Sequence, residues 1–111
     1  MKVEARVAPG ICNFNAVVTA ETEDSQAVTF AFETECETMQ AFAEQVKAIS
    51  PVDAIMSLSP DESPVLAIAR ELLQSKGCCE ACIVPASAVK AMQVAANLAL
   101  PKDIAIAIKK V

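Results

Sequence analysis

The spacing of apolar residues changes its period near residue 34, and this change restricts the fold more than any other feature. Before it, apolar and polar residues alternate over residues 2–8, 15–22 and 27–34, which predicts three half-buried strands. The short polar stretch 23–26 joins the second and third strands as an antiparallel hairpin. After residue 34 the spacing becomes that of amphipathic helices. The sequence therefore predicts a fold of both element types, with strands first.

Three helices are expected after the hairpin. The first begins at a capping box made by Thr34 and Glu37 and continues to about residue 49. A short turn or helix follows over residues 50–58. The second helix begins at Pro64 and ends at Gly77, and the third begins at Pro85 and continues to about residue 98.

A last strand is expected after Pro101, because Ile104, Ile106 and Ile108 alternate with alanine and lysine. The predicted order is β-β-β-α-α-α-β, and the fold class is α+β. The simplest arrangement is a four-stranded, mostly antiparallel sheet covered on one face by helices, in a single domain over residues 1–111. An exposed edge strand, 2–8 or 104–110, would allow pairing with a second copy as a homodimer.

Composition and charge exclude several functions. The net charge is −5, basic residues are dispersed, and the four aromatic residues are all phenylalanine, so neither nucleic acid nor an anionic membrane is an expected partner. No signal peptide or membrane-spanning run is present in the sequence, which predicts a cytoplasmic protein with reduced thiols. Without a phosphate loop, a catalytic triad or a zinc-protease motif, a non-catalytic protein is expected.

Five cysteines are the chemically distinctive residues, and the chain has no histidine. An odd number does not match a closed disulfide framework. The cysteines fall at the predicted ends of elements: Cys12 between the first two strands, Cys36 in the first turn of the first helix, and Cys78, Cys79 and Cys82 between the second and third helices. The only two glycines, Gly10 and Gly77, adjoin cysteines, where they permit tight turns.

The cysteine spacing predicts a metal site. Cys79 and Cys82 suit the capture of one tetrahedral ion, Cys12 and Cys36 would complete the site, and Cys78 is the alternative fourth ligand. Thiolates select zinc, Cu(I) or an iron–sulfur cluster. The surrounding glutamates repel anionic substrates, whereas a bound cation would offset the thiolate charge. The expected function is to store, deliver or sense zinc or an iron–sulfur cluster, with a possible protein partner for metal transfer.

Two alternatives use the same residues differently. Cys79 and Cys82 could form a thiol–disulfide redox pair, since Cys-x-x-Cys also serves redox chemistry. The cysteines could instead be structural residues of an interaction module, because cysteine often packs as a small apolar residue. Cys36, for example, shares a predicted helix face with Met39.

A pattern over nearly the whole chain combines residues 10–14 (Gly-Ile-Cys-Asn-Phe), Cys36, residues 82–85 (Cys-Ile-Val-Pro) and residues 98–103 (Leu-Ala-Leu-Pro-Lys-Asp). In this pattern the chain resembles a family of small uncharacterised proteins from anaerobic bacteria and archaea. That family has no established activity, so the resemblance implies a grouping and no mechanism.

The order of the cysteines also resembles that of iron–sulfur scaffold proteins of the IscU/NifU type. Cys12, Cys36 and Cys82 match the three scaffold cysteines in their placement relative to strands and helices. The chain departs from the scaffold pattern at Phe14, where the scaffold has Asp, and at Ala81, where it has His. The resemblance implies an IscU-like arrangement in which the three cysteines converge.

Overall fold

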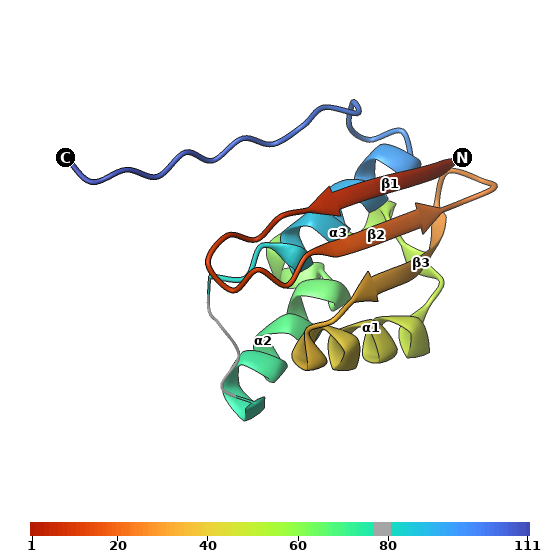
Figure 1. The fold of residues 1–111 in the computed structure, drawn as a ribbon. Helices are drawn as coiled ribbons and strands as arrows, with labels where there is room; N and C mark the ends of the chain where they lie inside the picture. Colours follow the sequence, from red (N-terminus) through yellow and green to blue (C-terminus); the bar gives the residue numbers. More distant parts are fainter. Residues whose placement is uncertain (77–80) are drawn as a thin grey trace.

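The N-terminal half of the chain forms an antiparallel sheet whose strand order follows the sequence. A computed structural model describes residues 1–76 and 81–111. Its strands are β1 (Lys2–Val7), β2 (Ala16–Glu21), β3 (Ala27–Thr34) and the short β4 (Val52–Asp53), ordered β1-β2-β3-β4 (Figure 1). Each strand is antiparallel to its neighbour. The three strands expected from alternation are therefore confirmed.

One face of this sheet is apolar and buried. In β2 the side chains of Ala16, Val18 and Ala20 are buried, and in β3 those of Val28 and Phe30 are buried. The residues between them in each strand are more exposed, as the period of two predicts. The sheet therefore needs a cover on one side only.

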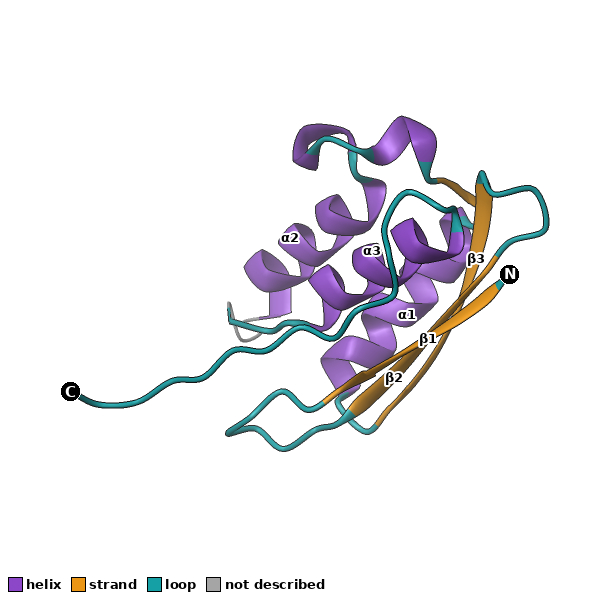
Figure 2. Ribbon diagram, turned by 90° about the horizontal axis from the view of Figure 1, so that it is seen from above, coloured by secondary structure: helices purple, strands orange, loops and turns teal. Residues whose placement is uncertain are grey.

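Three α-helices provide that cover. They are α1 (Glu37–Ile49), α2 (Pro64–Lys76) and α3 (Val84–Ala95), with two short 3₁₀ helices at Ile55–Ser57 and Pro60–Glu62. α1 packs on β3, α3 packs on β1 and β2, and α2 packs on α1 and α3. Figure 2 shows all three helices on the same side of the sheet. The predicted α+β class, with helices on one face, is confirmed.

The start of α1 differs from the predicted capping box. Thr34 pairs with Ala16 in the sheet, so it still belongs to β3. Cys36 is the N-cap residue, and its side chain makes no capping hydrogen bond. The Thr34 hydroxyl instead accepts a hydrogen bond from the backbone N–H of Cys36 at 3.2 Å. The prediction was wrong because pairing with β2 extends the strand through the residue expected to cap the helix.

The predicted last strand is also wrong. The fourth strand is β4, which lies between α1 and α2, so the observed order is β-β-β-α-β-α-α. Residues 101–111 are extended, unpaired and exposed. In Figures 1 and 2 they lead away from the body of the molecule. The predicted end of the second helix at Gly77 lies outside the described residues.

Hydrogen bonds close the end of the sheet where β2 turns into β3. One carboxylate oxygen of Asp24 accepts from the backbone N–H groups of Gln26 and Ala27, both at 2.9 Å, and from the hydroxyl of Thr22 at 3.1 Å. The backbone N–H of Ala27, followed by that of Gln26 and the Thr22 hydroxyl, lowers the pKa of Asp24. We call this the turn end of the sheet.

The end of α3 is fastened to the same place. The side-chain amide of Asn97 donates a hydrogen bond to the hydroxyl of Ser25 at 3.1 Å. α3 therefore finishes at the turn end and begins at the opposite end of the sheet. None of the helices within the described residues combines the length and apolar character needed to cross a bilayer.

Candidate functional site

The three described cysteines lie toward one end of the molecule. β1 and β3 run in the same direction, so the loop after β1 and the junction after β3 emerge at the same end of the sheet. The loop carries Cys12 and the junction carries Cys36. Cys82 lies just before Ile83, the N-cap residue of α3, and contacts the first turn of α1. We call this the cysteine end; Figure 1 shows it opposite the turn end.

Cys12 is presented at the tip of a tight turn. The backbone N–H of Asn13 donates to the carbonyl of Gly10 at 2.9 Å, and this bond closes the turn around Ile11 and Cys12. Gly10 has a φ of 99° and Asn13 a φ of 59°, values that glycine and asparagine adopt most readily. The Cys12 side chain is exposed. The turn therefore holds the Cys12 thiol toward solvent.

Cys36 sits where the chain passes from β3 into α1. Its carbonyl accepts the first helical hydrogen bond, from the N–H of Gln40 at 2.9 Å. Its side chain is half-buried and packs against the edge of the core. The amide of Gln40 also donates to the carbonyl of Thr34 at 2.8 Å, which ties the first turn of α1 to the end of β3. The position of this thiol is thus fixed by the backbone on both sides.

Cys82 contacts α1 through a second sulfur atom. Its thiol Sγ lies 3.7 Å from Sδ of Met39, in a contact where the thiol donates. Met39 is buried and lies one helical turn after Cys36. The sequence predicted Met39 as a core residue, which is confirmed, but its contact with a cysteine 43 residues away had no signal in the spacing. The approach to α3 and the start of α1 are therefore neighbours at the cysteine end.

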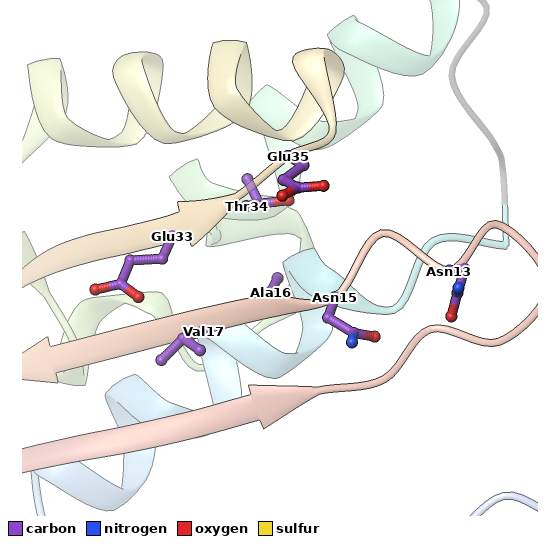
Figure 3. A pocket seen from close by; sticks show the side chains of 7 residues that line it. All are labelled: Asn13, Asn15, Ala16, Val17, Glu33, Thr34 and Glu35. Carbon is purple, nitrogen blue, oxygen red and sulfur yellow. The ribbon is translucent and has the colours of Figure 1, made fainter.

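An open pocket of about 370 Å³ lies at the same end of the sheet. It is lined by residues of the first loop, β2 and the end of β3: Asn13, Asn15, Ala16, Val17, Glu33, Thr34 and Glu35. Figure 3 shows two amide side chains on the loop side and two carboxylates on the β3 side. Pairing of β2 with β3, which the sequence predicted as a hairpin, brings the β2 and β3 residues of this set together. Their shared lining of a pocket with the first loop was not predicted from the sequence.

Three residues of the predicted four-thiolate site, Cys12, Cys36 and Cys82, lie within the described residues. Cys78 and Cys79 lie outside the described residues. Within residues 1–76 and 81–111, no three side chains of His, Cys, Asp or Glu are grouped closely enough to hold one metal ion. The complete set of Cys12, Cys36, Cys82 and one of Cys78 or Cys79 stays a prediction.

Fold and site together define a small α+β protein with a helix-covered antiparallel sheet and thiols toward one end. The chain belongs to the DUF6951 family, a family of unknown function whose model matches residues 3–108. This confirms the expected grouping with an uncharacterised family. Neither the curated proteins nor the solved structures contain a significant match to the chain.

Proposed function

We propose that the protein is a non-catalytic metal-binding protein that holds zinc or an iron–sulfur cluster at the cysteine end. The ligands would be Cys12, Cys36, Cys82 and Cys79, with Cys78 as the alternative to Cys79. The observation that carries the proposal is the placement of Cys82 against the first turn of α1, with its Sγ 3.7 Å from Sδ of Met39. This contact places Cys82 beside the first turn of α1, whose N-cap residue is Cys36.

The available donor atoms suit this chemistry. The chain has no histidine, so a tetrahedral protein site would be built from thiolates, alone or with a carboxylate. Thiolates favour zinc, Cu(I) and iron–sulfur clusters over magnesium and calcium. Glu33 and Glu35 line the pocket at the same end, and their negative charge favours a cation over an anionic substrate. The proposed role is therefore to hold, carry or sense the metal.

The order of Cys12, Cys36 and Cys82 along the chain adds a second, weaker argument. It resembles the order in IscU/NifU-type scaffolds, where three cysteines hold a cluster while it is assembled. A scaffold or carrier would pass its cluster to a receiving protein, which is the partner this proposal implies. The IscU-like spatial arrangement stays a prediction.

The test is elemental analysis and a visible spectrum of the full chain purified without oxygen. We expect a near-stoichiometric content of zinc, or of iron and sulfide with visible absorption. Cys36→Ser and Cys82→Ser should each lose most of that metal, because serine keeps the size of the side chain but supplies a poorer ligand. Met39→Leu is the matched control: it removes the neighbouring sulfur at nearly constant volume and should keep the metal.

Two results would contradict the proposal. One is a metal-free protein that takes up neither zinc nor iron and sulfide during anaerobic reconstitution. The other is a metal content that is unchanged in both serine variants. A reversible two-electron couple at Cys79 and Cys82 in metal-free protein, found by thiol titration at defined redox potentials, would favour the thiol–disulfide alternative.

A further inference from the structure

Residues 101–111 form an extended segment with the sequence pattern of a strand. Ile104, Ile106 and Ile108 alternate with Ala105 and Ala107, as in a strand with one buried face. Yet the three isoleucines are 55%, 68% and 92% exposed. Figure 1 shows the segment running clear of the sheet and the helices. One copy of the chain therefore leaves this apolar face in water.

The sheet has an open edge at β1, where another strand can add. The Met1 and Thr22 backbones exchange two hydrogen bonds, at 2.6 and 3.0 Å, so they form a hydrogen-bonded pair of the β1–β2 ladder. In an antiparallel ladder such pairs occur at every second residue. The backbone N–H and C=O groups of Lys2, Glu4 and Arg6 must therefore face away from β2, toward the open edge.

The buried face of the sheet is also incomplete at this edge. Val3 and Ala5 point to the same side as the core, but both are only half-buried, although they pack against it. α3 lies over this part of β1. A strand added beside β1 would place alternate side chains next to Val3 and Ala5, at the margin of the cover that α3 provides. β-Branched isoleucines suit such positions.

We propose that residues 104–110 of one copy add as a strand to the β1 edge of a second copy, and that the exchange is reciprocal. The partner is a second copy because this chain carries both halves of the contact. These are an unpaired extended segment of seven residues, 104–110, and the open edge of β1, which is six residues long. The family model spans 3–108, so it includes residues 3–7 of β1 and all three isoleucines. In a reciprocal contact, the β1 edge and the segment 104–110 of each copy both gain a backbone partner, and the assembly closes as a dimer. The inference does not depend on metal binding.

The first test changes the edge. Light scattering should give the full chain a mass of twice 11.7 kDa at micromolar concentration. Glu4→Pro removes an N–H that faces the open edge and leaves the β1–β2 bonds in place, because proline is tolerated on edge strands. This variant should have the mass of a monomer. Glu4→Thr is the matched control; it removes the same carboxylate, keeps the N–H, and should remain a dimer.

The second test changes the added strand. Ile106→Asp places a charge on the face expected to be buried, whereas Ala107→Asp places the same charge on the opposite face. The first variant should be a monomer and the second a dimer. Residues 101–111 are exposed in one copy, so neither change should disturb its fold, and far-UV circular dichroism checks this.

The alternatives give different results. A wild-type chain that is monomeric across the concentration range, with slowly exchanging amides over residues 104–110, would mean that the segment folds onto its own β1. A monomer in which these amides exchange rapidly would mean that the segment pairs with neither copy and is available to a different protein. A dimer that persists in both Glu4→Pro and Ile106→Asp would use another surface. Each of these outcomes overturns the proposal.

Discussion

At the turn end of the sheet, polar side chains are bonded to the backbone and to one another, whereas at the cysteine end the three described cysteines are exposed or half-buried. Asp24 accepts three hydrogen bonds within the β2–β3 turn, and Asn97 joins α3 to Ser25. At the other end, Cys12 is exposed on its turn, and Cys36 is half-buried beside the core. The two ends are built from the same strands.

This difference between the two ends distinguishes side chains that stabilise the fold from side chains that are available to bind a ligand. A carboxylate that already accepts three hydrogen bonds is committed to holding its turn, so changing it should affect stability. An exposed thiol on a turn closed by backbone hydrogen bonds contributes little to the fold and remains available to a ligand. The following substitutions test this contrast, from the largest expected effect to the smallest.

The largest effect should come from the core that both ends share. Phe42 is fully buried in α1, and its ring meets that of Phe32 edge-on with centroids 5.6 Å apart. Phe42→Ala should lower the free energy of unfolding by about 3–5 kcal/mol, measured by urea denaturation. Ile49→Ala, at the end of the same helix and 42% exposed, is the control and should cost far less. Equal losses would mean that α1 is not anchored through Phe42.

Asp24 should show a smaller effect that depends on pH. Its lowered pKa means that the folded protein favours the carboxylate form, so the stabilisation is present above the ordinary pKa of 3.8 and is lost as the pH falls through the lowered value. Asp24→Ala should therefore lower the Tm at pH 7, and the gap to wild type should narrow in acid. Glu23→Ala, its exposed neighbour, is the control. A gap that stays constant between pH 7 and pH 2 would contradict the assignment.

At the cysteine end, Cys82→Ser should cost only about 1 kcal/mol in metal-free protein, because its half-buried Sγ loses the contact with Sδ of Met39. Chemical denaturation in the presence of a chelator measures this. Met39→Leu provides the comparison from the other side of the contact. If Cys82→Ser lowered the free energy of unfolding as much as Phe42→Ala, Cys82 would be a core residue with a structural role.

The smallest effect on stability is expected at Cys12. Since its side chain is exposed, Cys12→Ser should change the free energy of unfolding by less than about 0.5 kcal/mol. In metal-free protein the Cys12 thiol should also react with iodoacetamide faster than that of Cys36, which is half-buried. Mass spectrometry of labelled peptides gives both rates. A slower reaction at Cys12 would mean that the turn does not present the thiol to solvent.

The sequence predicted where strands and helices lie better than it predicted which strands pair with one another. Alternation located β1, β2 and β3 because one face of each meets the core, and Pro85 lies within the first turn of α3. The same alternation over residues 104–110 suggested a strand in this sheet, but a period of two indicates only that one face is to be covered. It carries no information on which chain supplies the neighbouring strand.

For the candidate site, too, the positions of residues along the elements were predictable, whereas their contacts in three dimensions were not. Consecutive antiparallel strands place the loop of Cys12 and the junction of Cys36 at one end, and this follows from the element order alone. The contact between Cys82 and Met39 depends on how Cys82 packs against α1. The pocket beside Thr34 depends on the path that the loop after β1 takes beside β2 and β3. No spacing rule connects residues so distant in the chain.

The strand order β1-β2-β3-β4 also bears on how the molecule forms. Because β1, β2 and β3 each pair with the next strand through a short connection, this part of the sheet can assemble by closing short loops, which is the fast route for a β-structure. β4 follows only after α1. α3 is the exception: it packs on β1 and β2, and Asn97 reaches Ser25 across 72 residues. Docking of α3 is therefore the step with the greatest loss of chain entropy, and we expect it to set the rate at which the protein folds.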